Sequence, residues 1–280
     1  MSWDPVQYLK FSNQRLRPAL DLLARLPLRT PETVVDLGCG AGNVVRVLSE
    51  RWPDAHVTGV DSSAEMLEKA QAVLPSVEWQ LSEIASWQPS APVDLIFSNA
   101  ALHWLPHHDK LLARLVGFLK PGGLLAVQMP HNFAAPSHTS IDDALAGLPM
   151  SAAWRTRIMA AKLNHPVADP AQYYAWLKPK VAEVDIWETI YLHVLEGENA
   201  VAEWFKATAL IPVMDVLSEL EEENEAQTGH VGGLRERFWA DYCARTNTAY
   251  PRRHDGTTLF PMRRLFIVAR VAGATGKPGQ

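Results

Sequence analysis

The sequence has few cysteines and no long apolar run. Only two cysteines, Cys39 and Cys243, occur among its 280 residues, and they lie far apart along the chain. A disulfide is therefore not expected, and a reducing cytoplasm is the expected location. No stretch approaches the roughly 18 consecutive apolar residues of a membrane-spanning helix. Residues 1–18 carry charged side chains where a secretory signal peptide needs an apolar core.

An excess of positive charge is also missing. The net charge is −5, which argues against a protein that binds nucleic acid through its phosphates. Neither nucleic acid nor a membrane is therefore expected as a partner. The composition, 48% apolar and 20% charged, is ordinary for a globular protein, and 280 residues can bury one large core or two smaller ones.

The most informative stretch begins with a short apolar run, Val34–Leu37, which predicts a buried parallel strand. Three glycines then stand at every second position of Gly38–Gly42. Glycine tolerates the positive φ of a tight turn and lets a ligand lie against the backbone. A helix is predicted over Val44–Trp52, with Asn43 as its N-terminal cap.

Two features are absent from this loop. A dinucleotide fingerprint needs a further glycine where the chain has Asn43, and a phosphate-binding P-loop needs a lysine that does not follow. A second apolar strand, His56–Val60, ends in Asp61, whose carboxylate can accept hydrogen bonds from both ribose hydroxyls of an adenosine. The pattern predicts a nucleoside-binding site without a phosphate cradle, at the carboxyl ends of the strands.

The remaining apolar periodicity predicts alternating strands and helices. Further strands are expected at 77–80, 93–98, 124–129, 184–195 and 262–271. Further helices are expected at 111–119, 152–163, 171–177, 201–209, 213–227 and 234–250, together with one that a capping-box pattern at Ser62–Glu65 starts and that ends near Val73. Such alternation predicts an α/β fold with a doubly wound, mainly parallel sheet. An amphipathic helix within residues 3–26 either packs on the sheet or closes over the ligand.

Several segments resemble the landmarks of class I S-adenosylmethionine-dependent methyltransferases: Val34–Asn43, Asp61, Ser98–Ala100, Leu102–Pro106 and Leu119–Gly123. Over nearly its full length, the chain is similar to the trans-aconitate 2-methyltransferases. The segments that carry this second resemblance are Tyr8–Phe11, Ala126–Pro130, Glu183–Trp187, Phe260–Pro261 and Arg264–Ala269.

The resemblance implies a seven-stranded Rossmann-like sheet whose last strand is antiparallel, with a helical cap over the ligand edge. The parts expected from it are an N-terminal helical lid (1–30), an S-adenosylmethionine-binding α/β core (31–130), helical cap insertions (131–182 and 196–261) and the last two strands of the core sheet (183–195 and 262–272). The implied reaction is methyl esterification of a small di- or tricarboxylic acid, trans-aconitate being the expected acceptor. The cofactor product would be S-adenosylhomocysteine.

The predicted cofactor contacts lie at the carboxyl ends of the first four strands. They are Gly38, Cys39, Gly40, Asn43, Asp61, Ser62, Met66, Glu83, Ile84 and Asn99. Glu83 stands where the family often has an aspartate, and it could contact the adenine amino group. Met66 is either a core residue or an adenine contact.

A carboxylate acceptor needs no general base, because its reference pKa of about 4 leaves it ionised at neutral pH. No catalytic residue is therefore predicted. The expected substrate contacts are Tyr8, Trp104, His131 and Arg264. Trp104 is either a plain core residue or an aromatic face beside the sulfonium. The other arginines considered for the substrate carboxylates are Arg15, Arg17, Arg252, Arg253 and Arg263.

Some alternatives stay open. Ile211 replaces an arginine expected in the cap, so the acceptor could instead be a malonyl thioester carboxyl, an amine or a phenol. The chain could also bind S-adenosylmethionine without turnover, whereas Asn43 disfavours a nicotinamide dehydrogenase. His103, His107, His108 and Asp109 superficially resemble a metal cluster. Pro106 interrupts any helix that would align them, so no metal is predicted.

Overall fold

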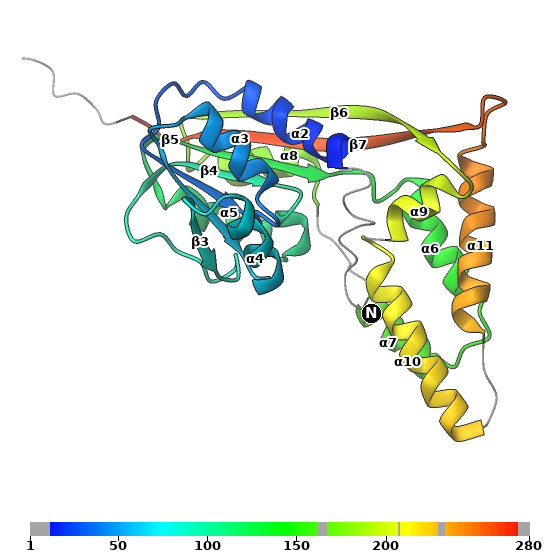
Figure 1. Cartoon of the computed structure of the whole chain (residues 1–280). Coiled ribbons are helices and arrows are strands. Elements are labelled where there is room, and N and C mark those ends of the chain that lie inside the picture. The colour runs from blue at the N-terminus through cyan, green and yellow to red at the C-terminus, as the bar shows by residue number, and fades with distance from the viewer. Residues whose placement is uncertain (1–11, 162–166, 207, 229–232, 274–280) are drawn as a thin grey trace, which may run out of the picture. The chain divides into compact units, whose positions relative to one another are not determined.

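The computed structural model describes residues 12–161, 167–206, 208–228 and 233–273 (Figure 1). These residues form two compact units. The sheet unit falls within residues 13–131, 165–189 and 264–273, and the helical unit falls within residues 132–161 and 190–263. Tyr8 and residues 1–11 of the predicted N-terminal lid lie outside the described residues. Within the described ranges, no helix is both long and apolar enough to span a lipid bilayer.

A seven-stranded sheet has the order β3-β2-β1-β4-β5-β7-β6. Its strands are β1 (Thr33–Leu37), β2 (His56–Asp61), β3 (Glu78–Leu81), β4 (Val93–Asn99), β5 (Leu119–Pro130), β6 (Glu183–Glu196) and β7 (Thr257–Arg270). Strands β1 to β5 pair in parallel, whereas β7 runs antiparallel to β5. The predicted fold class, including the antiparallel last strand, is therefore confirmed.

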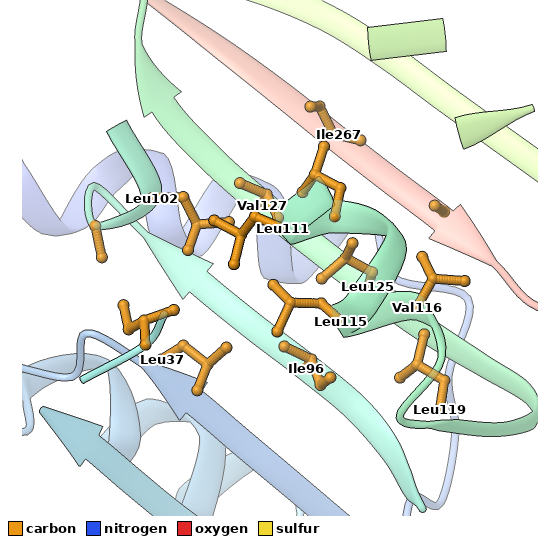
Figure 2. Close-up of a cluster of buried hydrophobic side chains, with 14 of the residues drawn as sticks. Leu37, Ile96, Leu102, Leu111, Leu115, Val116, Leu119, Leu125, Val127 and Ile267 are labelled. Atoms are coloured by element: carbon orange, nitrogen blue, oxygen red, sulfur yellow. The ribbon is translucent and has the colours of Figure 1, made fainter. Parts of the chain in front are cut away.

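The central strands are apolar because helices cover both faces of the parallel sheet. Figure 2 shows one covered face, where Leu111 and Leu115 of α5 (His108–Val116) lie over Ile96 of β4 and Leu125 of β5. Ile267 of β7 belongs to the same cluster, and all five side chains are at most 7% exposed. This packing orients the strands so that their carboxyl ends form one edge.

The other helices of the sheet unit are α2 (Ser12–Ala24), α3 (Asn43–Arg51), α4 (Ala64–Val73) and α8 (Pro170–Leu177), with a 3₁₀ turn η1 (Leu102–Trp104). The predicted cap of α3 is wrong. Gly42, at φ 80°, is the N-cap and offers no side chain, so Asn43 is the first helical residue. The predicted capping box of α4 is also displaced by one residue, since Ser63 is the cap and its Oγ accepts from the Met66 N–H at 3.3 Å.

Further boundaries differ from the predictions, and the strand expected at 262–271 starts five residues earlier, at Thr257. The helix expected at 111–119 spans His108–Val116, and β5 starts at Leu119 instead of 124. The backbone of Leu119 pairs with Val93, which extends β5 through the Pro-Gly-Gly segment. Helix α6 (Pro136–Ala146) was missed, and it begins with a proline at a position where the absent N–H is not needed.

The helical unit contains α6, α7 (Ala152–Ala161), α9 (Ala200–Lys206), α10 (Ile211–Thr228) and α11 (Leu234–Ala249). Its buried cluster includes Phe238 and Tyr242, whose rings are nearly parallel. Arg157 of α7 pairs with Glu219 and Glu223 of α10 at 2.6 Å each, so part of the acidic stretch is neutralised. That these helices cap the ligand edge stays a prediction.

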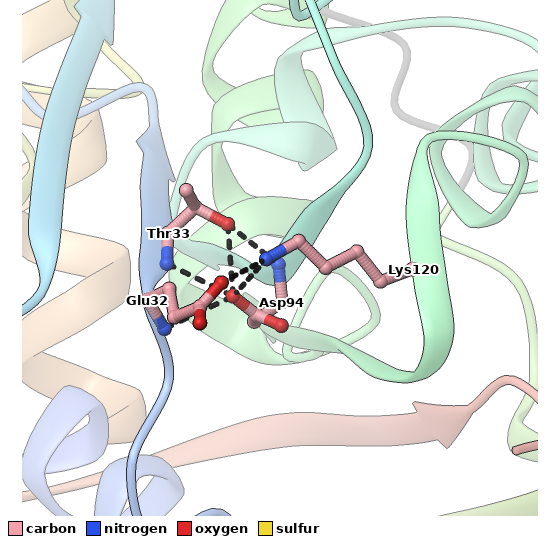
Figure 3. Close-up of polar contacts among 4 residues, drawn as sticks. All are labelled: Glu32, Thr33, Asp94 and Lys120. Carbon is pink, nitrogen blue, oxygen red and sulfur yellow. Dashed lines mark hydrogen bonds and ion pairs between the residues drawn. The ribbon is translucent and has the colours of Figure 1, made fainter.

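A polar network joins the amino ends of β1 and β4 to the start of β5, away from the carboxyl edge (Figure 3). Oδ2 of Asp94 accepts hydrogen bonds from the Thr33 N–H and hydroxyl, both at 2.9 Å, and from the Glu32 N–H at 3.0 Å. Lys120 Nζ lies 2.9 Å from both Asp94 and Glu32 carboxylates. Burial opposes ionisation of Asp94, but these donors outweigh it and hold its pKa below the ordinary value.

Candidate functional site

The glycine loop between β1 and α3 takes left-handed backbone at all three glycines, with φ of 75° at Gly38, 53° at Gly40 and 80° at Gly42. A Cβ on Gly38 would lie 2.2 Å from the Cβ of Ala101, and one on Gly42 would lie 2.8 Å from the Trp79 ring. A Cβ on Gly40 would meet nothing within 4 Å. Packing therefore demands glycine at two positions, whereas the third presents open backbone.

Asp61, at the end of β2, fastens this loop to the next helix. Its Oδ2 accepts from the Gly40 N–H at 2.8 Å, and its Oδ1 accepts from the Ser63 N–H at 2.9 Å. Each carboxylate oxygen can accept a second hydrogen bond, so both remain available to hydroxyl donors. Ser62, between Asp61 and Ser63 in the sequence, is exposed. Met66 on the first turn of α4 is half-buried.

Two polar side chains with buried oxygen atoms lie near the ends of the neighbouring strands β1 and β4. Asn99 was among the predicted cofactor contacts, whereas Asp36 was not. Asp36 in β1 is 1% exposed, and its Oδ2 has no hydrogen-bond partner among the described residues. Burial, and secondarily the nearby Asp61 carboxylate, raise its pKa to about 8. The Oδ1 of Asn99, at the end of β4, is buried and unpartnered in the same sense. A carboxylate inside the apolar run Val34–Leu37 was the available signal for Asp36.

Cys39 lines the loop as an inert thiol. It is buried, and burial raises its pKa far above the ordinary value, so it stays neutral. Cys39 and Cys243 are both free. Asn43 is exposed at the start of α3, so it is a candidate for contact with a ligand and not a helix cap.

The turn after β3 provides the other side of the predicted cofactor site. Ile84 is buried, and its Cδ1 lies 3.5 Å from the position that a Cβ on Gly38 would occupy. Arg114 of α5 holds the turn, because its guanidinium donates to the carbonyls of Ile84, at 2.5 Å, and Trp87. The Glu83 side chain is exposed. Arg114 was not predicted, since only the packing of α5 brings it to this turn.

The predicted substrate residues have different outcomes. Trp104 in η1 is 42% exposed, which excludes the first of its two interpretations, a plain core residue. Arg264 of β7 is buried and pairs with Pro130 at the end of β5. His131 follows that proline, and its Nδ1 lies 2.5 Å from the Glu188 carboxylate of β6. Glu188 was missed because its pairing depends on where β6 lies in the sheet.

The remaining candidates are less informative. Four of the other arginines considered for the substrate are exposed: Arg17, Arg252, Arg253 and Arg263. The side chain of Arg15 is outside the described part of the chain, and Ile211 starts α10 in the helical unit.

The residues after β4 that superficially resemble a metal cluster are not grouped as metal ligands in the described part of the chain. His108 is 2% exposed and is engaged at both ring nitrogens: Nε2–H donates to the Leu102 carbonyl at 2.9 Å, and Nδ1 accepts from the Tyr173 hydroxyl at 2.5 Å. Burial lowers its pKa, which favours this neutral tautomer. Across the described ranges, no three His, Cys, Asp or Glu side chains are grouped to hold a metal. The absence of a metal stays a prediction.

The sheet order, the left-handed glycine loop and the aspartate that ends β2 are those of the class I methyltransferase fold. The methyltransferase domain family matches residues 34–123. Phosphoethanolamine N-methyltransferase 2 of Haemonchus contortus aligns at a TM-score of 0.51 and 17% identity, covering 91% of this chain and 52% of that one. The YcgJ protein of Bacillus subtilis aligns at 0.56 and 15% identity, covering 92% of this chain and 100% of that one. At these identities the two structures support the fold alone.

Curated relatives refine this class. Trans-aconitate 2-methyltransferase of Azoarcus sp. is 45% identical over 96% of this chain and 98% of its own length. Relatives of the same name from Rhodopseudomonas palustris and Methylobacterium nodulans are 44% and 46% identical, over 95% and 96% of this chain and 98% of their own lengths. The chain belongs to the trans-aconitate 2-methyltransferase family.

Proposed function

We propose that this protein transfers a methyl group from S-adenosylmethionine to one carboxylate of a small tricarboxylic acid, and that the acid is trans-aconitate. The observation that carries the proposal is the 45% identity over 96% of the chain to a trans-aconitate 2-methyltransferase. The glycine loop and Asp61 support it, because they provide a nucleoside site that lacks a phosphate cradle.

The residues of the sheet unit fit this cofactor. Open backbone at Gly40 leaves room for a ligand, and both Asp61 oxygens can accept ribose hydroxyls. The unpartnered Oδ1 of Asn99 is an acceptor that suits a ligand carrying positive charge. When bound, the cofactor supplies an electrophilic methyl group on a sulfonium. Ile84, held through its carbonyl by Arg114, would form a wall of the adenine site.

The acceptor site requires orientation and not proton removal. A carboxylate is already ionised at neutral pH, so the attacking oxygen needs no base. Arg264 of β7 pairs with Pro130 at the end of β5, His131 follows that proline, and we assign both side chains to the carboxylates that do not react. A guanidinium can hold a carboxylate through two parallel hydrogen bonds, which fixes its orientation. Glu188 would orient the His131 ring.

A transfer assay tests the proposal. Purified protein is incubated with methyl-labelled S-adenosylmethionine and a panel that contains di- and tricarboxylic acids, a malonyl thioester, an amine and a phenol. Labelled product that is lost in mild base is expected with trans-aconitate, because esters hydrolyse there while methylated amines and phenols survive. Base-stable product from an amine or phenol would show that the acceptor is not a carboxylic acid. Base-labile product from a malonyl thioester alone would identify that thioester as the acceptor in place of trans-aconitate. Binding of cofactor without any transfer would support the non-catalytic alternative.

The cellular setting is part of the same proposal. We place the protein in the cytoplasm, without nucleic acid or membrane as a partner. Two free buried thiols and the net charge of −5 support this placement. Recovery of the protein in a washed membrane fraction or with nucleic acid would contradict it.

A further inference from the structure

A row of side chains crosses the sheet at the level where β4 ends. Asn99 of β4 pairs in register with Gln128 of β5, and Gln128 pairs with Phe266 of β7. Residues paired across neighbouring strands point to the same face of a sheet. Two amides and an aromatic ring therefore stand side by side on one face, and Trp187 of β6 stacks on Phe266 with 4.8 Å between ring centroids.

The amide of Gln128 is buried without a partner. The residue is 1% exposed, and neither Nε2 nor Oε1 has a hydrogen-bond partner within the described part of the chain. Its backbone is engaged, since the Gln128 carbonyl accepts from the Ala100 N–H at 2.9 Å. A buried polar group without a partner is unfavourable for folding, and such groups are rare in native proteins. An apolar residue would suit the fold at this position better than glutamine does.

The surroundings of the row favour an anion. Arg264 lies diagonally across from Gln128, on the same face, because it is two residues before Phe266 on the antiparallel strand. Diagonal neighbours across a strand pair are about 7–8 Å apart, within the reach of long side chains. Asp36, on the same face two strands away from β5, keeps its proton at neutral pH because its pKa is about 8. At the far side of the row, Trp187 stacks on Phe266, and the Arg25 guanidinium lies 4.6 Å from the centroid of the Trp187 ring.

We propose that Gln128 is a substrate-binding residue whose side-chain N–H donates a hydrogen bond to a carboxylate of the acceptor acid, beside Arg264. This inference rests on the proposed function, since it presumes a carboxylic acid as acceptor. Gln128 and Arg264 then select a planar anion together. The amide N–H orients the carboxylate through a directed hydrogen bond, and the positive charge of the guanidinium attracts it. Glutamine is retained there at the expense of stability in the ligand-free protein.

Two measurements on Gln128→Met test the proposal. Methionine has a similar length and no hydrogen-bonding amide. Ligand-free Gln128→Met is expected to unfold at the same temperature as the wild type or higher. Calorimetry with trans-aconitate, on protein saturated with S-adenosylhomocysteine, is expected to show a Kd raised about 10- to 100-fold, the range for losing a hydrogen bond to a charged group. The Kd for S-adenosylhomocysteine should change less than about twofold. Gln128→Glu should weaken acid binding further, because two carboxylates would face each other.

Thr246→Val in α11 is the matched control. Thr246 is also fully buried, but its hydroxyl is satisfied by the Tyr242 and Cys243 carbonyls at 2.8 and 3.1 Å. This variant should unfold at a lower temperature and bind trans-aconitate normally. A similar loss of stability in Gln128→Met would show that the amide serves the fold and would overturn the proposal. So would unchanged acid affinity, or a loss confined to S-adenosylhomocysteine. Wild-type protein that binds no carboxylic acid would refute the proposed acceptor instead, and the assignment of Gln128 with it.

Discussion

At the scale of single residues, Asp61 holds the glycine loop and is the proposed ligand of the ribose hydroxyls. Its two oxygens already accept backbone N–H groups of Gly40 and Ser63. Asp61→Ala is expected to weaken S-adenosylhomocysteine binding by about 1–3 kcal/mol and to lower the unfolding temperature as well. Calorimetry and thermal unfolding measure the two effects, with the exposed Asp54→Ala as control. Unchanged cofactor affinity would place the nucleoside site elsewhere.

Asp36 predicts a pH dependence of stability. Burial first, and Asp61 second, raise its pKa to about 8, whereas an unfolded aspartate titrates near 4. Between these values the native protein holds a proton that the unfolded chain has released. The free energy of unfolding therefore falls as pH rises from about 4 to 8. In ligand-free protein, Asp36→Asn should remove this decline and unfold at a higher temperature than the wild type at pH 9, with little difference at pH 5.

Thermal unfolding across this pH range checks the prediction. Each 1 kcal/mol corresponds to roughly 2–4 °C for a chain of this size. An equal offset between Asp36→Asn and the wild type at pH 5 and pH 9 would mean that Asp36 does not titrate in the window.

At the scale of elements, two glycines of the loop between β1 and α3 should respond differently to substitution. A change at Gly38 should mainly affect folding, and a change at Gly40 should mainly affect ligand binding. Gly38→Ala would bring a methyl carbon to 2.2 Å from Ala101 and should destabilise the protein by about 3 kcal/mol or more. Gly40→Ala meets no atom, so its cost to folding is limited to the positive φ, about 1–2 kcal/mol. Its main effect should be a weaker affinity for S-adenosylhomocysteine. Gly40→Ala with wild-type affinity would show that no ligand lies against that backbone.

The network around Asp94 should stabilise the amino ends of the strands. Its hydrogen bonds with Thr33, Glu32 and Lys120 hold the Asp94 pKa below the ordinary value in spite of burial. A lowered pKa stabilises the fold above the unfolded pKa, and this contribution is lost as pH falls through the folded one. Asp94→Asn should therefore lower stability by about 2 kcal/mol at pH 7 and progressively less below pH 4. Denaturant unfolding at pH 7 and at a pH below 4 measures this difference in stability, and unchanged cofactor affinity is the control. A loss of stability that is equal at the two pH values would contradict the prediction.

Elements defined by local pattern were predicted well, and those that depend on distant partners were not. The apolar runs of β1, β2 and β4 indicated buried parallel strands, and Asp61 could be placed at a strand end from sequence. The start of β5 at Leu119 depends on its pairing with Val93, and the cap of α3 depends on Gly42 taking a positive φ. The same holds at the site. The spacing of the glycines and of Asp61 in the sequence predicted their place in the site. The unpartnered Gln128 and the Glu188–His131 pair could be found only from the pairing of the strands in the folded sheet.

At the scale of the whole molecule, the described cofactor candidates all belong to the sheet unit. A ligand that binds only the native state at 100 times its Kd adds about 2.7 kcal/mol to stability. Saturation with S-adenosylhomocysteine should therefore raise the unfolding temperature and slow amide hydrogen exchange in Gly38–Asn43 and Asp61–Met66. Amides inside α11 serve as the internal control, with a smaller change expected. Protection confined to α11 would contradict a site built on the sheet unit.

The strand order β5-β7-β6 has a consequence for synthesis on the ribosome. Strand β7 is the last described strand in the sequence, yet it lies between two strands made earlier. Until translation passes Arg270, β5 lacks its antiparallel neighbour and exposes a row of unpaired backbone N–H and C=O groups, the kind of edge on which nascent chains aggregate. The sheet can thus be completed only after Arg270 has been made, and nascent chains that stop before Thr257 would depend on chaperones to stay in solution.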